Sequence, residues 1–134
     1  MSKDWVHDIA MMHEYYNVHP IIENMDKETL KKFMSFRISF LEEELSELRT
    51  AENAADIVDA LIDLCVVAIG TLDGFGVDSY KAWDEVLIAN MKKKAGIKPE
   101  RPNPLGLPDL IKPVGWVAPS HEDNIGLVSK IFED

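Results

Sequence analysis

The chain has a single cysteine among its 134 residues, so an internal disulfide is excluded. No run of 18 apolar residues occurs, and the first eight residues, MSKDWVHD, do not resemble a signal peptide. Basic residues are few: the chain has 14 Lys and Arg and 24 Asp and Glu, which gives a formal net charge of -10 at pH 7. Nucleic acids and anionic membranes are bound by basic surfaces, so neither is an expected partner. We expect a cytoplasmic protein.

Proline is almost missing from the first 97 residues, which hold Pro20 alone, whereas the remaining six prolines follow. With 46% hydrophobic and 28% charged residues, the composition suits one globular domain over residues 1–134. Residues 17–26 are expected to be a connection that Pro20 interrupts, and residues 73–77 a glycine turn. Apolar spacing predicts helices over these ranges: 4–16, 27–49, 56–70 and 78–94.

The fold class is therefore all-α, with a four-helix bundle over residues 1–97. Residues 98–134 are too rich in proline for a regular helix and too apolar for a free linker. They are expected to wrap the bundle or a neighbouring subunit, with a last short helix at 125–132. The apolar surface of the fourth helix and this tail also predicts an oligomer.

The predicted helix over residues 56–70 carries an unusual acidic stripe. Asp56, Asp59 and Asp63 fall within about 60° of one another on a helical wheel. The rest of the helix is apolar or small, which indicates burial. Buried carboxylates are costly unless they are paired or bound to a cation, so basic side chains or metal should face this stripe.

A second acidic group lies on the helix before it. Glu43, Glu44 and Glu47 continue a stripe of phenylalanines, whereas Glu42 projects about 160° away from Glu44 and is expected to be solvated. The alternative interpretation is that all these glutamates form an ordinary solvated charge run.

The short polar link at 50–55 should fold the two helices antiparallel, so that the glutamates face Asp59 and Asp63. Four or five carboxylates on facing helices would form an oxygen site suited to Mg²⁺ or Mn²⁺. Zinc is not expected, because no Cys/His cluster has ligand spacing.

The flanking helices give weaker indications. His7 and His13 can be read simply as polar residues at a helix edge. Trp83, Val86, Leu87 and Met91 are spaced for a core in the fourth helix. Lys93 follows Asn90 by three residues and can share its face, although lysines at the end of a helix also favour the helix dipole.

Three motifs in order resemble the MazG-like, all-α nucleoside triphosphate pyrophosphohydrolases. Glu43–Glu47 fits EExxE, an acidic pair follows on an apolar helix, and Asn90–Lys93 fits the NMxK of phosphoribosyl-ATP pyrophosphohydrolase-type members. The PDLIKP stretch of the tail is similar to viral members. The family's second motif is ExxD, and Ala60 stands at its glutamate position when Asp63 is the aspartate. Asp59 is the favoured substitute, with Asp56 and Asp59 as the alternative pair.

The resemblance implies hydrolysis of a nucleoside triphosphate to the monophosphate and pyrophosphate, with roughly two or three Mg²⁺ or Mn²⁺ ions per site. It implies a homodimer or homotetramer, and the viral likeness suggests a purine deoxynucleotide such as dGTP. Phosphoribosyl-ATP pyrophosphohydrolase and dUTPase activities are alternatives, as is a non-catalytic acidic protein that docks on a basic partner.

The roles that the resemblance implies fall into three groups. The metal ligands would be Glu44, Glu47, Asp59 and Asp63. The catalytic residues would be Glu43 or Glu44, which would take a proton from water, and Lys93, which would hold phosphate oxygens. Substrate contacts would come from Asn90, Lys93, Trp5, His13, Tyr16 and Asn17.

Overall fold

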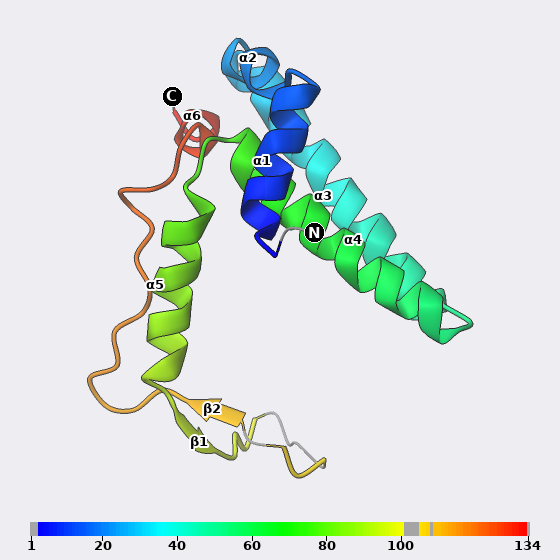
Figure 1. The fold of residues 1–134 in the computed structure, drawn as a ribbon. Helices are drawn as coiled ribbons and strands as arrows, with labels where there is room; N and C mark the ends of the chain where they lie inside the picture. The colour runs from blue at the N-terminus through cyan, green and yellow to red at the C-terminus, as the bar shows by residue number, and fades with distance from the viewer. Residues whose placement is uncertain (1–2, 101–104, 108, 134) are drawn as a thin grey trace. The chain divides into compact units, whose positions relative to one another are not determined.

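The computed structural model describes residues 3–100, 105–107 and 109–133, and these are mostly helical (Figure 1). The all-α prediction is confirmed. Contacts divide the chain into two compact units: one comprises the residues up to Ser79 together with those from Ile125, and the other runs from Tyr80 to Asn124. In the described ranges no helix has both the length and the apolar character needed to cross a membrane.

The N-terminal helices are α1 (Trp5–Tyr15) and α2 (Val18–Glu23). Asp4 caps α1 by accepting a hydrogen bond from the backbone N–H of His7 at 3.0 Å. The prediction of a connection interrupted by Pro20 is wrong, because α2 occupies most of it. Pro20 lies in the first turn of α2, where a missing N–H leaves no helical hydrogen bond unmade.

Helices α3 (Lys27–Thr50) and α4 (Ala54–Gly74) form the expected hairpin and lie side by side in Figure 1. Asp26 caps α3 by accepting from the backbone N–H of Thr29, at 2.8 Å. Helix α4 extends four residues beyond the predicted end, so the expected turn begins late. Gly74 is buried inside α4. In the turn that follows α4, Gly76 is the glycine with a positive φ, at 75°.

The core of the first unit lies where α2, the start of α3 and the end of α4 meet. Ile22, Leu30 and Phe75 are its most deeply buried side chains. Helix α6 (Val128–Ile131) packs against this core, shorter than the predicted 125–132. The chain reaches it through Gly126, where any Cβ would collide with the carbonyl oxygen of Phe75.

The second unit contains most of α5 (Ser79–Met91) and a two-stranded antiparallel sheet. Strand β1 (Lys94–Gly96) pairs with β2 (Asp109–Ile111), so that Ala95 lies opposite Leu110. Sequence reasoning missed this ladder, because three-residue strands give too little alternation to be recognised.

The proline-rich segment packs on α5 inside the second unit. The Trp116 indole N–H donates to the carbonyl of Ala89 at 2.7 Å, and Lys81 pairs with Asp123 at 2.7 Å. These contacts join the proline-rich segment to α5 within the second unit. The expected division of the chain at residue 97 stays a prediction. The expectation of one domain over 1–134 stays a prediction.

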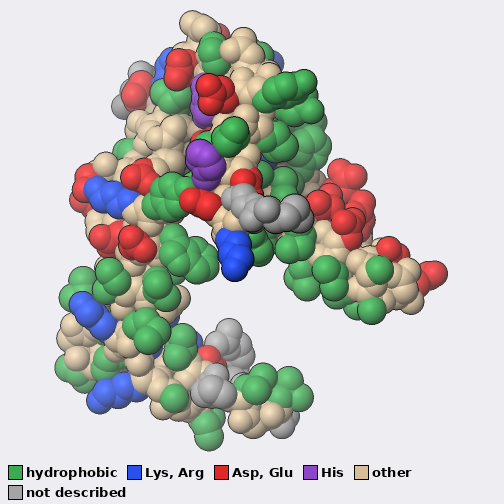
Figure 2. Space-filling view, in the orientation of Figure 1, with side chains coloured by type: hydrophobic (Ala, Val, Ile, Leu, Met, Phe, Trp, Pro, Cys, Tyr) green, Lys and Arg blue, Asp and Glu red, His purple; other side chains and the backbone are tan. Residues whose placement is uncertain are grey.

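Several residues predicted for the core are exposed in the single chain. Trp83 is 69% exposed and Met91 77%, and Val86 and Leu87 are also exposed. Helix α4, predicted to be buried all round, exposes Val58 by 61%. The prediction of burial is wrong for these side chains within one chain. Figure 2 shows many apolar side chains on the face in view.

Candidate metal and nucleotide site

The acidic cluster is centred on Glu44 of α3. Its side chain is half-buried, and its Oε2 atom is shielded from solvent without a hydrogen-bond partner among the described residues. Burial raises the pKa of Glu44 to about 7, and the neighbouring carboxylates Glu47, Asp63 and Glu43 raise it in the same direction. The hairpin thus brings glutamates of α3 close to Asp63 of α4, as the antiparallel geometry predicted.

The other acidic residues are placed less centrally. Glu43 and Glu47 are exposed beside Glu44, and Asp59 is exposed one turn before Asp63. Asp56 accepts a hydrogen bond from Asn53 Nδ2 at 2.9 Å, while its own backbone N–H donates to Asn53 Oδ1 at 2.9 Å. Asp56 therefore serves the N-terminal cap of α4.

A different group has the tightest convergence of ligand atoms. Among the described residues, His13, His19 and Asp73 each offer one ligand atom, and these atoms lie within 4.8 Å of one another. The predicted carboxylate ligands do not form such a group in that part of the chain. Like charges keep them apart, whereas imidazole N–H groups can approach a carboxylate.

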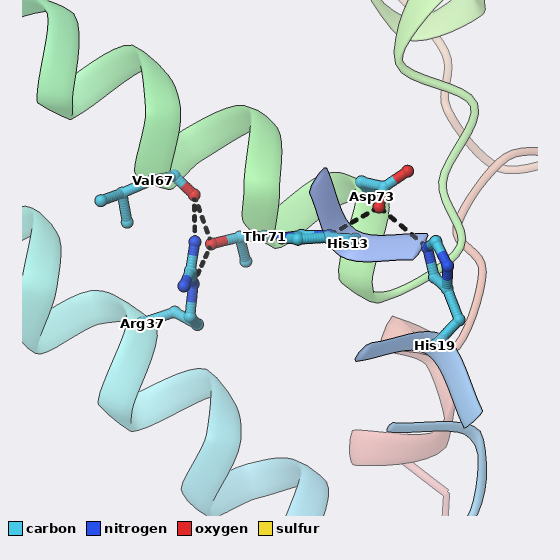
Figure 3. Close-up of polar contacts among 6 residues, drawn as sticks. All are labelled: His13, His19, Arg37, Val67, Thr71 and Asp73. Carbon is cyan, nitrogen blue, oxygen red and sulfur yellow. Dashed lines mark hydrogen bonds and ion pairs between the residues drawn. The ribbon is translucent and has the colours of Figure 1, made fainter. Parts of the chain in front are cut away.

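Asp73 joins three helices through one oxygen atom. Its Oδ2 accepts from His13 Nδ1 at 2.6 Å and from His19 Nε2 at 2.8 Å (Figure 3). His13 comes from α1 and is 8% exposed, His19 comes from α2, and Asp73 lies in the last turn of α4. The interpretation of His13 as an ordinary edge residue is wrong, because it is buried and bonded to Asp73.

Arg37 supplies a partly buried cation between α3 and α4. Its Nε donates to Thr71 Oγ1 at 2.9 Å and its Nη2 to the carbonyl of Val67 at 3.0 Å (Figure 3). Burial lowers the pKa of this guanidinium. Gly70 makes room for it, because a Cβ there would lie 2.8 Å from Nη2. Sequence reasoning missed this role of Arg37; its only available signal was a basic residue two turns before Glu44.

The four residues expected to contact base and sugar do not lie together. Trp5 lines a cavity of about 280 Å³ with residues from α1 and α4, namely Asp8, Ile9, Ile62, Cys65, Val66 and Ile69. Tyr16 and Asn17 follow the other end of α1, about 16 Å along the helix axis at 1.5 Å per residue. Both are exposed, and His13 is turned toward Asp73.

The NMxK residues, 90–93, lie in the second unit, at the end of α5 and just before β1. The backbone N–H of Lys93 donates to the carbonyl of Asn90 at 3.1 Å, just after α5 ends. Lys93 Nζ lies 5.1 Å from the centre of the Trp116 ring, and Lys112 Nζ lies at the same distance. Trp116 therefore makes cation–π contacts with two lysines.

These features define an all-α protein with a cluster of carboxylates between two antiparallel helices. The family model described as phosphoribosyl-ATP pyrophosphohydrolase matches residues 18–90, more than half of the chain. The chain belongs to this family, within the MazG-like all-α superfamily. The family indicates a pyrophosphohydrolase that acts on a nucleotide. A search of curated proteins finds no match.

The matched range starts at α2 and ends at Asn90. It contains the whole acidic cluster and Arg37, but neither Lys93 nor α1. The site-residue assignments to metal, catalysis and substrate remain predictions.

Proposed function

We propose that this protein hydrolyses a nucleoside triphosphate to the monophosphate and pyrophosphate, using Mg²⁺ or Mn²⁺. The ions would be held by Glu44, Glu47, Asp59 and Asp63. A purine deoxynucleotide such as dGTP is the proposed substrate, and phosphoribosyl-ATP and dUTP are the alternatives. Family membership supports pyrophosphohydrolase activity on a nucleotide, and the acidic cluster supports the metal.

The single observation that carries this proposal is the state of Glu44. One of its carboxylate oxygens is shielded from water and has no donor in the part of the chain that the structure describes, and three other carboxylates raise its pKa. Such an arrangement is unfavourable in itself, because each charge opposes the others. Hard divalent cations prefer carboxylate oxygens, so the residues present fit Mg²⁺ or Mn²⁺.

The chain's own groups provide the remaining chemistry. Glu43 is exposed beside Glu44 and is the proposed acceptor of the proton that the attacking water loses. The water oxygen would bond to the α-phosphorus as the bond to the departing pyrophosphate breaks. Bound divalent cations would neutralise phosphate charge and lower the pKa of water. Lys93 and Asn90 are the proposed phosphate contacts.

The direct test is pyrophosphate release from a panel of ribo- and deoxynucleoside triphosphates and phosphoribosyl-ATP, with and without Mg²⁺. We expect release from at least one nucleotide only when the metal is present. If no nucleotide yields pyrophosphate and Mg²⁺ does not raise Tm, the proposal fails, and a non-catalytic acidic protein becomes the better account.

We also propose that the protein is a homodimer or homotetramer. Exposed apolar side chains on α4 and α5, such as Val58 and Trp83, support association, because monomers seldom expose large contiguous apolar surface. Sedimentation should give a species larger than the 15.1 kDa chain at micromolar concentration. A monomer under those conditions would contradict this proposal.

A further inference from the structure

We propose that His13, His19 and Asp73 form a second metal site, which binds a divalent transition-metal ion of the zinc class. The three ligand atoms are His13 Nδ1, His19 Nε2 and Asp73 Oδ2, all within 4.8 Å of one another. Asp73 lies ten residues after Asp63 on α4, about 15 Å along the helix axis. The site is therefore separate from the carboxylates around Glu44.

The chemistry of these ligands differs from that of the acidic cluster. Two imidazoles and one carboxylate suit zinc and its neighbours among the transition metals, whereas Mg²⁺ prefers oxygen ligands alone. Spacing along the chain does not indicate such a site, because the histidines are six residues apart and the aspartate follows 54 residues after the second. The expectation that zinc has no binding site rested on spacing along the chain, which the fold overrides.

The site is preorganised by its surroundings. The side chain of His13 is 11% exposed and that of Asp73 16%, so both are held by packing. The side chain of His19 is 36% exposed, which leaves a route for an ion and for a water molecule as a fourth ligand. The three ligands come from α1, α2 and α4, so a bound ion would link these helices.

The distances between these ligand atoms are those of hydrogen bonds. His13 Nδ1 and His19 Nε2 both donate to Asp73 Oδ2, at 2.6 and 2.8 Å. Ligand atoms around tetrahedral zinc are about 3.3 Å apart, given zinc–ligand bonds of about 2.0–2.1 Å. Binding therefore requires each nitrogen to move away from Asp73 Oδ2 by about 0.5–0.7 Å. At each ligating nitrogen the metal would replace the hydrogen that is bonded to Asp73, and the imidazole would carry its hydrogen on the other ring nitrogen.

The test uses Zn²⁺ alone as the probe, with the full chain. We expect isothermal titration to show one equivalent bound at this site, and excess Zn²⁺ to raise Tm by on the order of 5–10 °C at a hundredfold excess over Kd. His19→Ala should abolish this rise, because it removes a ligand whose side chain is partly exposed. Mg²⁺ should not reproduce it at this site.

Two controls separate this site from others. His7→Ala removes an exposed histidine on α1 and should leave the Zn²⁺ response unchanged. Glu44→Gln should also leave it unchanged, although it alters the acidic cluster. Cobalt(II) provides a second readout, since its visible bands intensify in a four-coordinate site, and His19→Ala should remove that intensity.

The proposal is overturned if Zn²⁺ raises Tm equally in wild type and His19→Ala, because the ion then binds elsewhere. It is equally overturned if Zn²⁺ neither binds nor raises the Tm of wild type. In that case the three residues form a hydrogen-bonded link between helices and nothing more. Neither outcome bears on pyrophosphate release, which tests the proposed function separately.

Discussion

Asp63 and Asp73 lie on the same helix but in opposite electrostatic surroundings. Asp73 is half-buried and receives two imidazole N–H donors, so its charge is matched within the chain. Asp63 is half-buried near Glu44, whose pKa is raised by burial and by the carboxylates Glu47, Asp63 and Glu43. Among the described residues, Glu44 Oε2 has no hydrogen-bond partner. The difference shows that burial alone does not mark a carboxylate as functional. The informative feature is whether the fold supplies its donors.

The largest expected effect comes from Glu44→Gln. It removes a charge while preserving shape, and pyrophosphate release should fall by about two orders of magnitude or more if Glu44 binds metal. Glu42→Gln is the matched control, because Glu42 is exposed on the same helix and should change activity only a few-fold. Steady-state assays of both variants decide the matter. Equal small effects would mean that the acidic stripe is a solvated charge run.

Asp73→Asn should instead act on stability. It leaves the buried His13 without its charged acceptor, and losing such hydrogen bonds costs about 1–3 kcal/mol. Urea unfolding in the absence of transition metals measures this. Asp84→Asn, the same change at an exposed position on α5, should be nearly neutral. A negligible loss in Asp73→Asn would show that the His13–Asp73 contact adds little to the fold.

The pH dependence of stability should distinguish the two regions more finely. The pKa of Glu44 is raised from 4.5 to about 7, so the folded state favours its protonated form. Its contribution to stability is full below pH 4.5 and is lost as the pH rises through about 7. Metal-free Tm should therefore fall more steeply from about pH 5 to 8 in wild type than in Glu44→Gln.

Added Mg²⁺ should flatten the wild-type profile, because a bound cation replaces the proton in balancing the acidic cluster. If the metal-free Tm of wild type and of Glu44→Gln depended on pH in the same way, the raised pKa of Glu44 would not contribute to stability.

The smallest expected effect is at Gly70, beside Arg37. Gly70→Ala places a Cβ 2.8 Å from Arg37 Nη2 and should displace the guanidinium from the Val67 carbonyl. The better helix propensity of alanine offsets part of this loss, so the net destabilisation should be within about 1 kcal/mol. In an Arg37→Met background, denaturant unfolding should show that Gly70→Ala raises the free energy of unfolding, because no guanidinium is displaced there. A stabilising effect in the wild-type background would mean that Arg37 relaxes at no cost.

Local patterns in the sequence were sufficient for the main helices and the facing of Glu44 and Asp63. The cap at Asp26 and the apolar period of α3 and α4 depend on residues close in the chain, and the short link leaves few ways to connect the two helices. The EExxE and NMxK motifs led to the family that the comparison then confirmed. Pro20 predicts a break in the chain, and local spacing does not show that it lies in the first turn of α2.

The sequence by itself determined the helical class, the hairpin and the family, because these follow from residue periodicity and from motifs a few residues long. Only the tertiary structure decided that His13 and His19 donate hydrogen bonds to Asp73. The same holds for the hydrogen bonds that Arg37 donates to Thr71 and Val67. Such contacts join residues tens of positions apart, and their existence depends on how helices pack rather than on any local spacing.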